Sequence, residues 1–319
     1  MSRRTGGGND RGTPARPRRP APAPTCSSLP CRSSGGSSFL FIKVGLDGLS
    51  PLQIAWARSV LGGITLVLIV VVTRQSWPRA RVWLEMIPPS LLLTVIPFFL
   101  IAYGGQFITS GLMSIYNATT PLWTLLIAIA ALPSERPTGR KYVALALGFV
   151  GVVVLLSPWT ITGSSTLLGQ LASIGAAACY GGGYVTLRRV VAKYDLSPIT
   201  IAALQVGIGS VLCLFATGWV AADHDVDLNA TIVICMLLLG CLGTGIAYVF
   251  NVNVVRAKGA TTASMVTYLN PVVSVTLGVI ILSEAVHWNE PVGALLIIAG
   301  ILIGQQRAAP RTPPSRTGS

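Results

Sequence analysis

Long apolar segments alternate with short polar segments along most of this chain. A run of about 18 or more apolar residues is long enough, as a helix, to cross a hydrocarbon core of ~30 Å. Nine runs meet this length, and each predicts a membrane-spanning helix. Their approximate bounds are 50–73, 87–108, 110–132, 140–157, 166–187, 197–219, 231–255, 260–283 and 289–306. Residues 37–46 form only half of a tenth run.

The segment that precedes this half run is rich in Pro, Arg and Ser, although apolar residues would be needed there to complete a span. One interpretation is that the true N-terminus has been replaced, by a frameshift or a wrongly chosen start, so that the first span is truncated. The alternative is a genuine disordered tail on a nine-span protein. A signal or transit peptide is disfavoured because no apolar core of the usual length is present. We expect residues 1–34 to be a disordered or aberrant tail.

The chain contains an internal repeat. "SIYNATTPLWT" at 114–124 aligns with "SMVTYLNPVVS" at 264–274, and "LSP" at 49–51 recurs at 196–198. Each copy holds five spans, and because five is odd the second copy must enter the membrane in the opposite orientation. The expected fold is therefore an all-α, ten-helix bundle of two inverted five-helix repeats, at 35–157 and 166–306, followed by a disordered cytoplasmic tail at 307–319.

Composition supports a membrane protein. The chain is 52% hydrophobic and only 10% charged, with a mean hydropathy of +0.68, whereas about a quarter of the residues in soluble domains are charged. This protein therefore belongs in a bilayer rather than in solution.

The net charge of +13 is informative through its positions. If the half run at 37–46 is counted as span 1, the loops after spans 3, 5, 7 and 9 contain no Lys or Arg. By the positive-inside rule, the loops that carry the cations face the cytoplasm, as do both termini. The excess charge is thus a topology signal and does not indicate a nucleic-acid partner. The cations in question are Arg74, Arg79, Arg81, Arg136, Arg140, Lys141, Arg188, Arg189, Lys193, Arg256, Lys258, Arg307, Arg311 and Arg316.

Three segments carry a family resemblance: "GGSSFLFIKVGLDGLSPLQIAWARSVLGG", "YNATTPLWTLLIAIAALPSERPTGRK" and "LNPVVSVTLGVIILSEAVHWNEPVGALLIIAGILIG". They resemble the EamA family of the drug/metabolite transporter superfamily. The resemblance implies ten helices in two repeats, cytoplasmic termini, and export or exchange of small metabolites. The chain departs from the family at its start, where only Gly36, Ser37 and Ser38 remain of a Trp-Gly-Ser-Ser-like turn.

A carrier needs polar side chains around a central cavity, because polar atoms that face lipid are costly. Polar residues recur at helical spacing in equivalent spans of both repeats, which predicts a shared cavity. The alternative is that they bond neighbouring helices and that the prolines form static bends. The candidate cavity residues are Tyr103, Gln106, Asn117, Pro121, Thr124, Tyr248, Asn251, Thr267, Asn270, Pro271 and Ser274.

Three charged residues are further candidates. Arg58 lies about eight residues into its span, and the repeat places Gln205 at the equivalent position. It could attract an anionic group of the substrate, or it could be structural, bonding exposed carbonyls. Glu135 and Glu284 end equivalent spans on opposite sides of the membrane. They could couple proton entry to transport, or they could cap helices.

These features favour a secondary transporter of small metabolites, such as amino acids or drug-like compounds, that works by alternating access in the cytoplasmic membrane. No phosphate-binding GxxxxGK[ST] loop occurs, no cysteines have metal-ligand spacing, and both histidines, His224 and His287, fall in outer loops. We therefore expect no cofactor, no metal and no enzymatic activity. An inactive or non-transporting membrane protein and an intramembrane enzyme are the alternatives.

The expected partners are the lipid bilayer and a small-molecule substrate. Gly300 and Gly304 in the last span have GxxxG spacing, which serves close helix packing either within one chain or across a homodimer.

Overall fold

The computed structural model describes residues 37–131, 139–156, 164–218, 226–264, 267 and 269–305, and all regular elements in these ranges are helices. The first repeat contains α1 (Ser37–Gly45), α2 (Pro51–Val72), α3 (Ala80–Ser90), the π-helical segment η1 (Leu91–Val95), α4 (Ile96–Gly104), α5 (Ser110–Asn117), α6 (Thr120–Ala131) and α7 (Gly139–Leu156). The second contains α8 (Ser164–Lys193), α9 (Pro198–Gly218), α10 (Ala230–Leu237), the π-helical segment η3 (Leu238–Ile246), α11 (Ala247–Lys258), α12 (Ala260–Ser264), α13 (Leu269–Leu282) and α14 (Asn289–Gln305).

Within these ranges, five helical segments are long and apolar enough to cross a membrane: Pro51–Val72, Ala80–Gly104, Ser110–Ala131, Pro198–Phe215 and Ala230–Ala257. Shorter apolar helices cover Ala146–Leu155, Asn270–Leu282 and Asn289–Gly300. α8 has 30 residues, but its many Gly, Ala and Ser residues lower its hydropathy. The prediction of an all-α polytopic membrane protein is confirmed.

The first span is short in the part that is described. α1 has 9 residues, or about 13 Å of helix at ~1.5 Å per residue, whereas its counterpart α8 has 30. The expectations for residues 1–34 and 307–319 lie outside the described residues.

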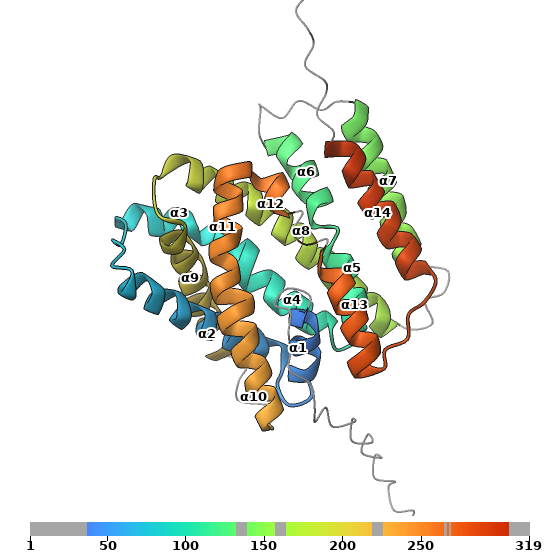
Figure 1. Ribbon diagram of the computed structural model, residues 1–319, viewed down its shortest axis with the longest axis horizontal. Helices are drawn as coiled ribbons and strands as arrows, with labels where there is room; N and C mark the ends of the chain where they lie inside the picture. Colours follow the sequence, from blue (N-terminus) through green and yellow to red (C-terminus); the bar gives the residue numbers. More distant parts are fainter. Residues whose placement is uncertain are drawn as a thin grey trace, which may run out of the picture. The chain divides into compact units, whose positions relative to one another are not determined.

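Helix packing follows the repeat. α2 packs on α9 and α7 packs on α14, so equivalent helices of the two halves face each other (Figure 1). α2 also packs on η3, as its counterpart α9 packs on η1, and α8 packs on α3 as α1 packs on α10. This reciprocal pattern is what a pseudo-two-fold arrangement of two similar halves requires.

Both repeats contain the same irregularities. A π-helical segment interrupts the third span of each half, at η1 and at η3. The fourth span of each half is broken, between α5 and α6 and between α12 and α13. Pro121 is the second residue of α6 and Pro271 the third of α13, where a missing N–H costs no intrahelical hydrogen bond. The prolines therefore begin half-helices instead of bending continuous ones.

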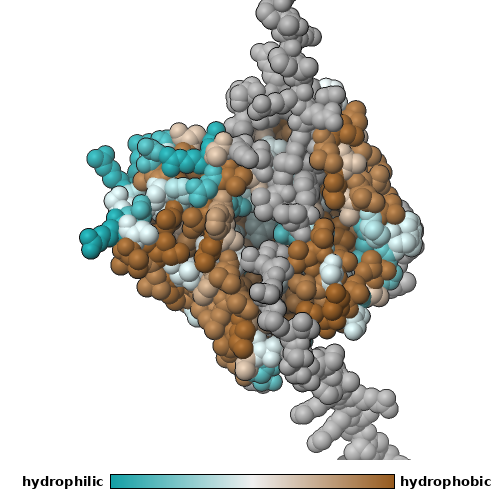
Figure 2. Space-filling model, viewed as in Figure 1, coloured by the Kyte–Doolittle hydropathy of each residue, from teal (hydrophilic) through white to brown (hydrophobic). Residues whose placement is uncertain are grey.

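The outward surface is apolar. Ile64, Leu68 and Val71 on α2 are exposed, as are Leu214 and Phe215 on α9. Figure 2 shows hydrophobic side chains over α10, α11, α13 and α14, with hydrophilic side chains gathered around α3. In a bilayer these apolar side chains face lipid, so their exposure carries no hydrophobic penalty.

Basic side chains close the ends of the third span in both halves. Lys43 on α1 donates from Nζ to the carbonyls of Gly105 and Ile108, at 2.6 and 2.9 Å. Arg188 on α8 donates to the carbonyls of Val255 and Arg256, at 3.3 and 3.2 Å. Cations at a helix C-terminus satisfy free carbonyls and oppose the helix dipole. Each half thus uses its first helix to hold the end of its own third span.

Candidate functional site

A cavity of about 470 Å³ lies between the two repeats. α2, α4 and α5 contribute Arg58, Phe98 and Asn117, while α8, α9 and α11 contribute Tyr180, Gln205 and Tyr248. The cavity is therefore shared between the halves.

Arg58 is the charged residue of the lining, and it is 5% exposed. Its Nε donates a hydrogen bond to the hydroxyl oxygen of Thr244, at 3.3 Å. The guanidinium carbon lies 3.5 Å from the centre of the Phe98 ring, which is the geometry of a cation–π contact. Together these contacts hold the guanidinium against α4 and η3.

The π-helical segments provide partners for cavity side chains. A π-helical turn widens the helix and disturbs its regular hydrogen bonds. In η3, Thr244 donates its hydroxyl hydrogen to the carbonyl of Leu239, at 3.1 Å, while its oxygen accepts from Arg58. In η1, the carbonyl of Leu93 accepts the hydroxyl hydrogen of Tyr248, at 2.6 Å.

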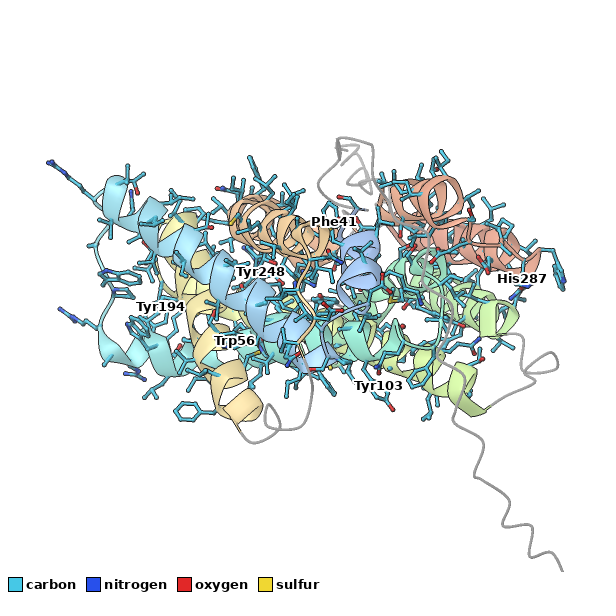
Figure 3. All side chains as sticks on the ribbon, turned by 90° about the horizontal axis from the view of Figure 1, so that it is seen from below. Phe41, Trp56, Tyr103, Tyr194, Tyr248 and His287 are labelled. Carbon is cyan, nitrogen blue, oxygen red and sulfur yellow. The ribbon has the colours of Figure 1, made fainter. Side chains whose placement is uncertain are left out.

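Aromatic side chains form one wall of the cavity. Phe98 and Tyr248 meet edge to face, with ring centres 6.2 Å apart. The hydroxyl of Tyr184 accepts a hydrogen bond from Nδ2 of Asn251, at 2.7 Å. Figure 3 shows Tyr248 among the central helices, whereas Tyr194 and His287 lie toward opposite ends. Hydrogen bonds hold the Tyr184 and Tyr248 rings, so this part of the wall is preorganised.

Two buried amides of the lining have unused hydrogen-bonding capacity. Both polar atoms of the Gln205 side chain, and Oδ1 of Asn117, have no hydrogen-bond partner among the described residues. Gln205 is 1% exposed and Asn117 is 5% exposed. A buried polar atom without a partner costs about 1–3 kcal/mol, and a ligand in the cavity could remove that cost.

The structure brings six of the predicted site residues to this cavity. They are Arg58, Asn117, Tyr248, Asn251, Thr267 and Asn270. These residues come from two spans of each repeat.

The other predicted cavity residues do not line it. Tyr103 lies against Phe99 and Phe107, with ring centres 5.9 and 5.3 Å away, and Figure 3 shows it at the edge of the bundle. Gln106 is exposed in the turn after α4. Helical spacing identified the polar positions, but it cannot tell which side of a helix meets the cavity.

The hydroxyl residues near the two span breaks bond backbone carbonyls, Thr124 within its own helix and Ser274 on a neighbouring one. Thr124 donates to the carbonyl of Thr120, at 2.9 Å, and Ser274 donates to the carbonyl of Ser110, at 3.0 Å. Pro121 and Pro271 begin half-helices and are buried.

Sequence reasoning missed several lining residues, including Ser38, Phe98, Tyr180 and Tyr184. Gln205 was identifiable, since the repeat places it opposite Arg58. The spacing of aromatic residues along the chain does not distinguish those that line the cavity from those that face lipid.

Of the two carboxylates considered for proton coupling or helix capping, the structure describes Glu284. Glu284 accepts hydrogen bonds from the first residues of α5, Ser110 and Gly111, so its geometry is that of a helix cap. Glu135 lies outside the described residues. Within the described residues no cluster of His, Cys, Asp or Glu could hold a metal ion.

Comparisons with known proteins agree with this architecture. The EamA-like transporter family matches residues 34–157 and again 167–304. The uncharacterized transporter YoaV of Bacillus subtilis (strain 168) is 27% identical over 273 residues, which cover 84% of this chain and 91% of YoaV.

Two further proteins are similar to this chain. The uncharacterized inner membrane transporter YedA of Escherichia coli (strain K12) is 24% identical, over 76% of this chain and 78% of YedA. A solved crystal structure with 18% sequence identity has a similar fold, with a TM-score of 0.58 over 84% of this chain and 94% of that one. With both repeats matched by one family, this chain belongs to the EamA-like transporter family.

Proposed function

We propose that this membrane transporter is a secondary carrier that exports or exchanges small metabolites across the cytoplasmic membrane by alternating access. The observation that carries the proposal is the cavity around Arg58, to which both repeats contribute. When two inverted halves share one site, rocking of one half against the other exposes that site to each side in turn.

The span breaks provide places where such a movement can occur. Asn117 and Thr267, both in the lining, lie at the breaks between α5 and α6 and between α12 and α13. Movement of a half-helix would change the cavity without unfolding a whole span. The π-helical segments support the same idea, since such turns are frequent at functional sites.

Contacts at one end of the bundle support a closed outer side. Glu284 bonds the start of α5, Lys43 bonds the end of α4, and the amide of Asp227 donates to the carbonyl of Gly48, at 3.1 Å. These contacts lie in or beside the loops without Lys or Arg, which the positive-inside rule places outside. In this proposal, the structure represents a state whose cavity is accessible from the cytoplasm.

Counterflow into proteoliposomes tests the function. The purified full chain is reconstituted, and the vesicles are preloaded in turn with unlabelled amino acids, carboxylic acids, nucleosides and amines. We expect at least one preloaded compound to drive uptake of its labelled form above that of protein-free vesicles. If folded protein shows no counterflow with any of these classes, the carrier proposal is contradicted.

A further inference from the structure

Arg58 has no carboxylate partner in the part of the chain that the structure describes. The ion pairs there join Arg81 and Lys193 to Glu85, Arg256 to Asp195, and His287 to Glu290. Glu284 is engaged with α5. Among the described residues, the guanidinium contacts the Thr244 hydroxyl and the face of the Phe98 ring, both of which are neutral.

This arrangement is unfavourable unless something else supplies a negative charge. A buried cation loses its hydration, and neutral dipoles replace only part of that stabilisation. Thr244 engages Nε, and the terminal nitrogens of a guanidinium form a planar fork that matches a carboxylate. An anion in the cavity would complete the site.

The neighbouring amides complement an anion. Nε2 of Gln205 is a buried donor without a partner among the described residues, and Oδ1 of Asn117 is a buried acceptor in the same condition. Both residues line the cavity with Arg58. A donor can assist in binding a carboxylate, while an acceptor suits an amino or hydroxyl group on the same molecule.

The charge balance limits the class of anion. Arg58 is the charged side chain in the described lining, so one negative charge neutralises the site and a doubly charged phosphate would leave an excess. The rings of Phe98, Tyr180 and Tyr248 offer an apolar wall to the rest of the ligand. A cavity of about 470 Å³ is within the range for metabolite-sized ligands.

We propose that the cavity binds a small monocarboxylate that also carries a hydrogen-bond donor, with its carboxylate at Arg58 and Gln205. This inference rests on the proposed carrier function, since it assigns a substrate class to the same cavity.

Paired acids and carboxamides test the inference through binding. Thermal unfolding of the purified, detergent-solubilised full chain is followed while amino acids, 2-hydroxy acids and simple carboxylic acids are titrated, each beside its own carboxamide. We expect at least one acid to bind about tenfold or more tightly than its carboxamide, as charge-assisted bidentate bonding predicts. Chloride is held constant throughout.

Variants assign this preference to the cavity. Arg58→Gln should remove the preference for the acid, and Arg58→Lys should retain part of it. Because Arg58→Gln also removes the contacts of Arg58 with Thr244 and Phe98, Gln205→Glu is a second test: an internal carboxylate facing the same cavity should also abolish the preference. Arg81→Gln, which changes an exposed arginine, should leave it intact.

The outcomes separate this inference from the carrier proposal. The monocarboxylate assignment is overturned if no acid binds, if carboxamides bind as tightly as acids, or if both Arg58→Gln and Gln205→Glu keep the preference. Counterflow of amines or nucleosides alone would preserve the carrier and reject the assignment. Binding of acids without any counterflow would preserve the assignment of the site and reject the carrier.

Discussion

Glu284 accepts hydrogen bonds from Ser110, in the first turn of α5, with both of its carboxylate oxygens. Oε1 accepts from the Ser110 amide at 2.8 Å, and Oε2 accepts from the Ser110 hydroxyl at 2.7 Å and from the Gly111 amide at 3.3 Å. The first amides of a helix have no intrahelical partners, and a negative charge there is favourable. Because Glu284 follows α13 and Ser110 begins α5, this cap joins the two repeats.

Replacing Glu284 should therefore destabilise the bundle. Glu284→Ala removes three hydrogen bonds to a partly buried carboxylate and should cost about 1–2 kcal/mol. Thermal unfolding in detergent measures the loss, and Glu284→Gln should show a smaller one. Asp195→Ala, which removes an exposed ion pair with Arg256, serves as the comparison and should shift the melting temperature less.

The same contact bears on proton coupling. Both carboxylate oxygens of Glu284 are engaged in capping α5, so we assign this residue a structural role and no role in proton coupling. The pH dependence of counterflow should therefore be the same in Glu284→Gln and in the original chain. A loss of pH dependence in this variant, with folding intact, would assign Glu284 to coupling instead.

The lining residues at the two span breaks lead to a second prediction. Asn117→Ala combined with Thr267→Ala removes polar groups from equivalent positions of both halves. We expect counterflow to fall by about tenfold or more, since the two side chains would no longer hydrogen-bond the transported compound, a loss of ~1 kcal/mol for each bond. Purified yield and melting temperature should change little.

Matched substitutions outside the cavity control for general damage. Asn253 and Thr276 are exposed on α11 and α13, and each donates to a carbonyl of its own helix. Asn253→Ala combined with Thr276→Ala should leave counterflow unchanged. Equal loss in both double variants would contradict the assignment of Asn117 and Thr267.

Sequence patterns predicted the spans and the repeat because both depend on properties that the chain displays directly. The length of an apolar run indicates whether it can cross a bilayer, and prolines at the equivalent positions 121 and 271 indicate duplication. The breaks beside those prolines are local consequences of the same residues. The membrane architecture was therefore accessible without coordinates.

The cavity was less accessible, and two residues show why. Tyr103 and Tyr248 occupy equivalent positions in the two repeats, yet Tyr248 lines the cavity while Tyr103 packs on Phe99 and Phe107. Which face of a helix meets a cavity depends on packing between distant spans. The π-helical segments, which change helix rotation locally, were also invisible to a search for regular periodicity.

Close packing of α2 on η3 leads to a third prediction. A Cβ on Gly62 would lie 2.8 Å from Cγ2 of Thr244 and 3.1 Å from the carbonyl oxygen of Gly240. Gly62→Ala should push Thr244, the partner of Arg58, away and cost about 1–3 kcal/mol by overpacking. Melting temperature and acid binding should both fall.

Gly207 on α9 is the matched control. A Cβ there meets nothing within 4 Å, so Gly207→Ala should gain about 0.5–1 kcal/mol from the helix preference of alanine. If Gly62→Ala is as stable as Gly207→Ala, the close contact between α2 and η3 does not constrain the bundle.

The membrane orientation leads to the last prediction. Single cysteines are introduced after all six native cysteines are replaced, and intact cells are treated with a membrane-impermeant maleimide. Ser76 lies in the loop with Arg74 and Arg79, which the positive-inside rule places in the cytoplasm. Ala285 and Leu228 are exposed in loops that follow the fourth and second spans of the second repeat.

Ala285→Cys and Leu228→Cys should react in intact cells, whereas Ser76→Cys should react only after permeabilisation. The charge asymmetry is the reason for this difference, because moving the cations of the Ser76 loop across the bilayer would be unfavourable during insertion. The reverse labelling pattern would place the Glu284 cap on the cytoplasmic side, and the cavity would then be accessible from outside. Labelling of all three sites in intact cells would indicate mixed insertion, which an inverted repeat with a weak charge bias would produce.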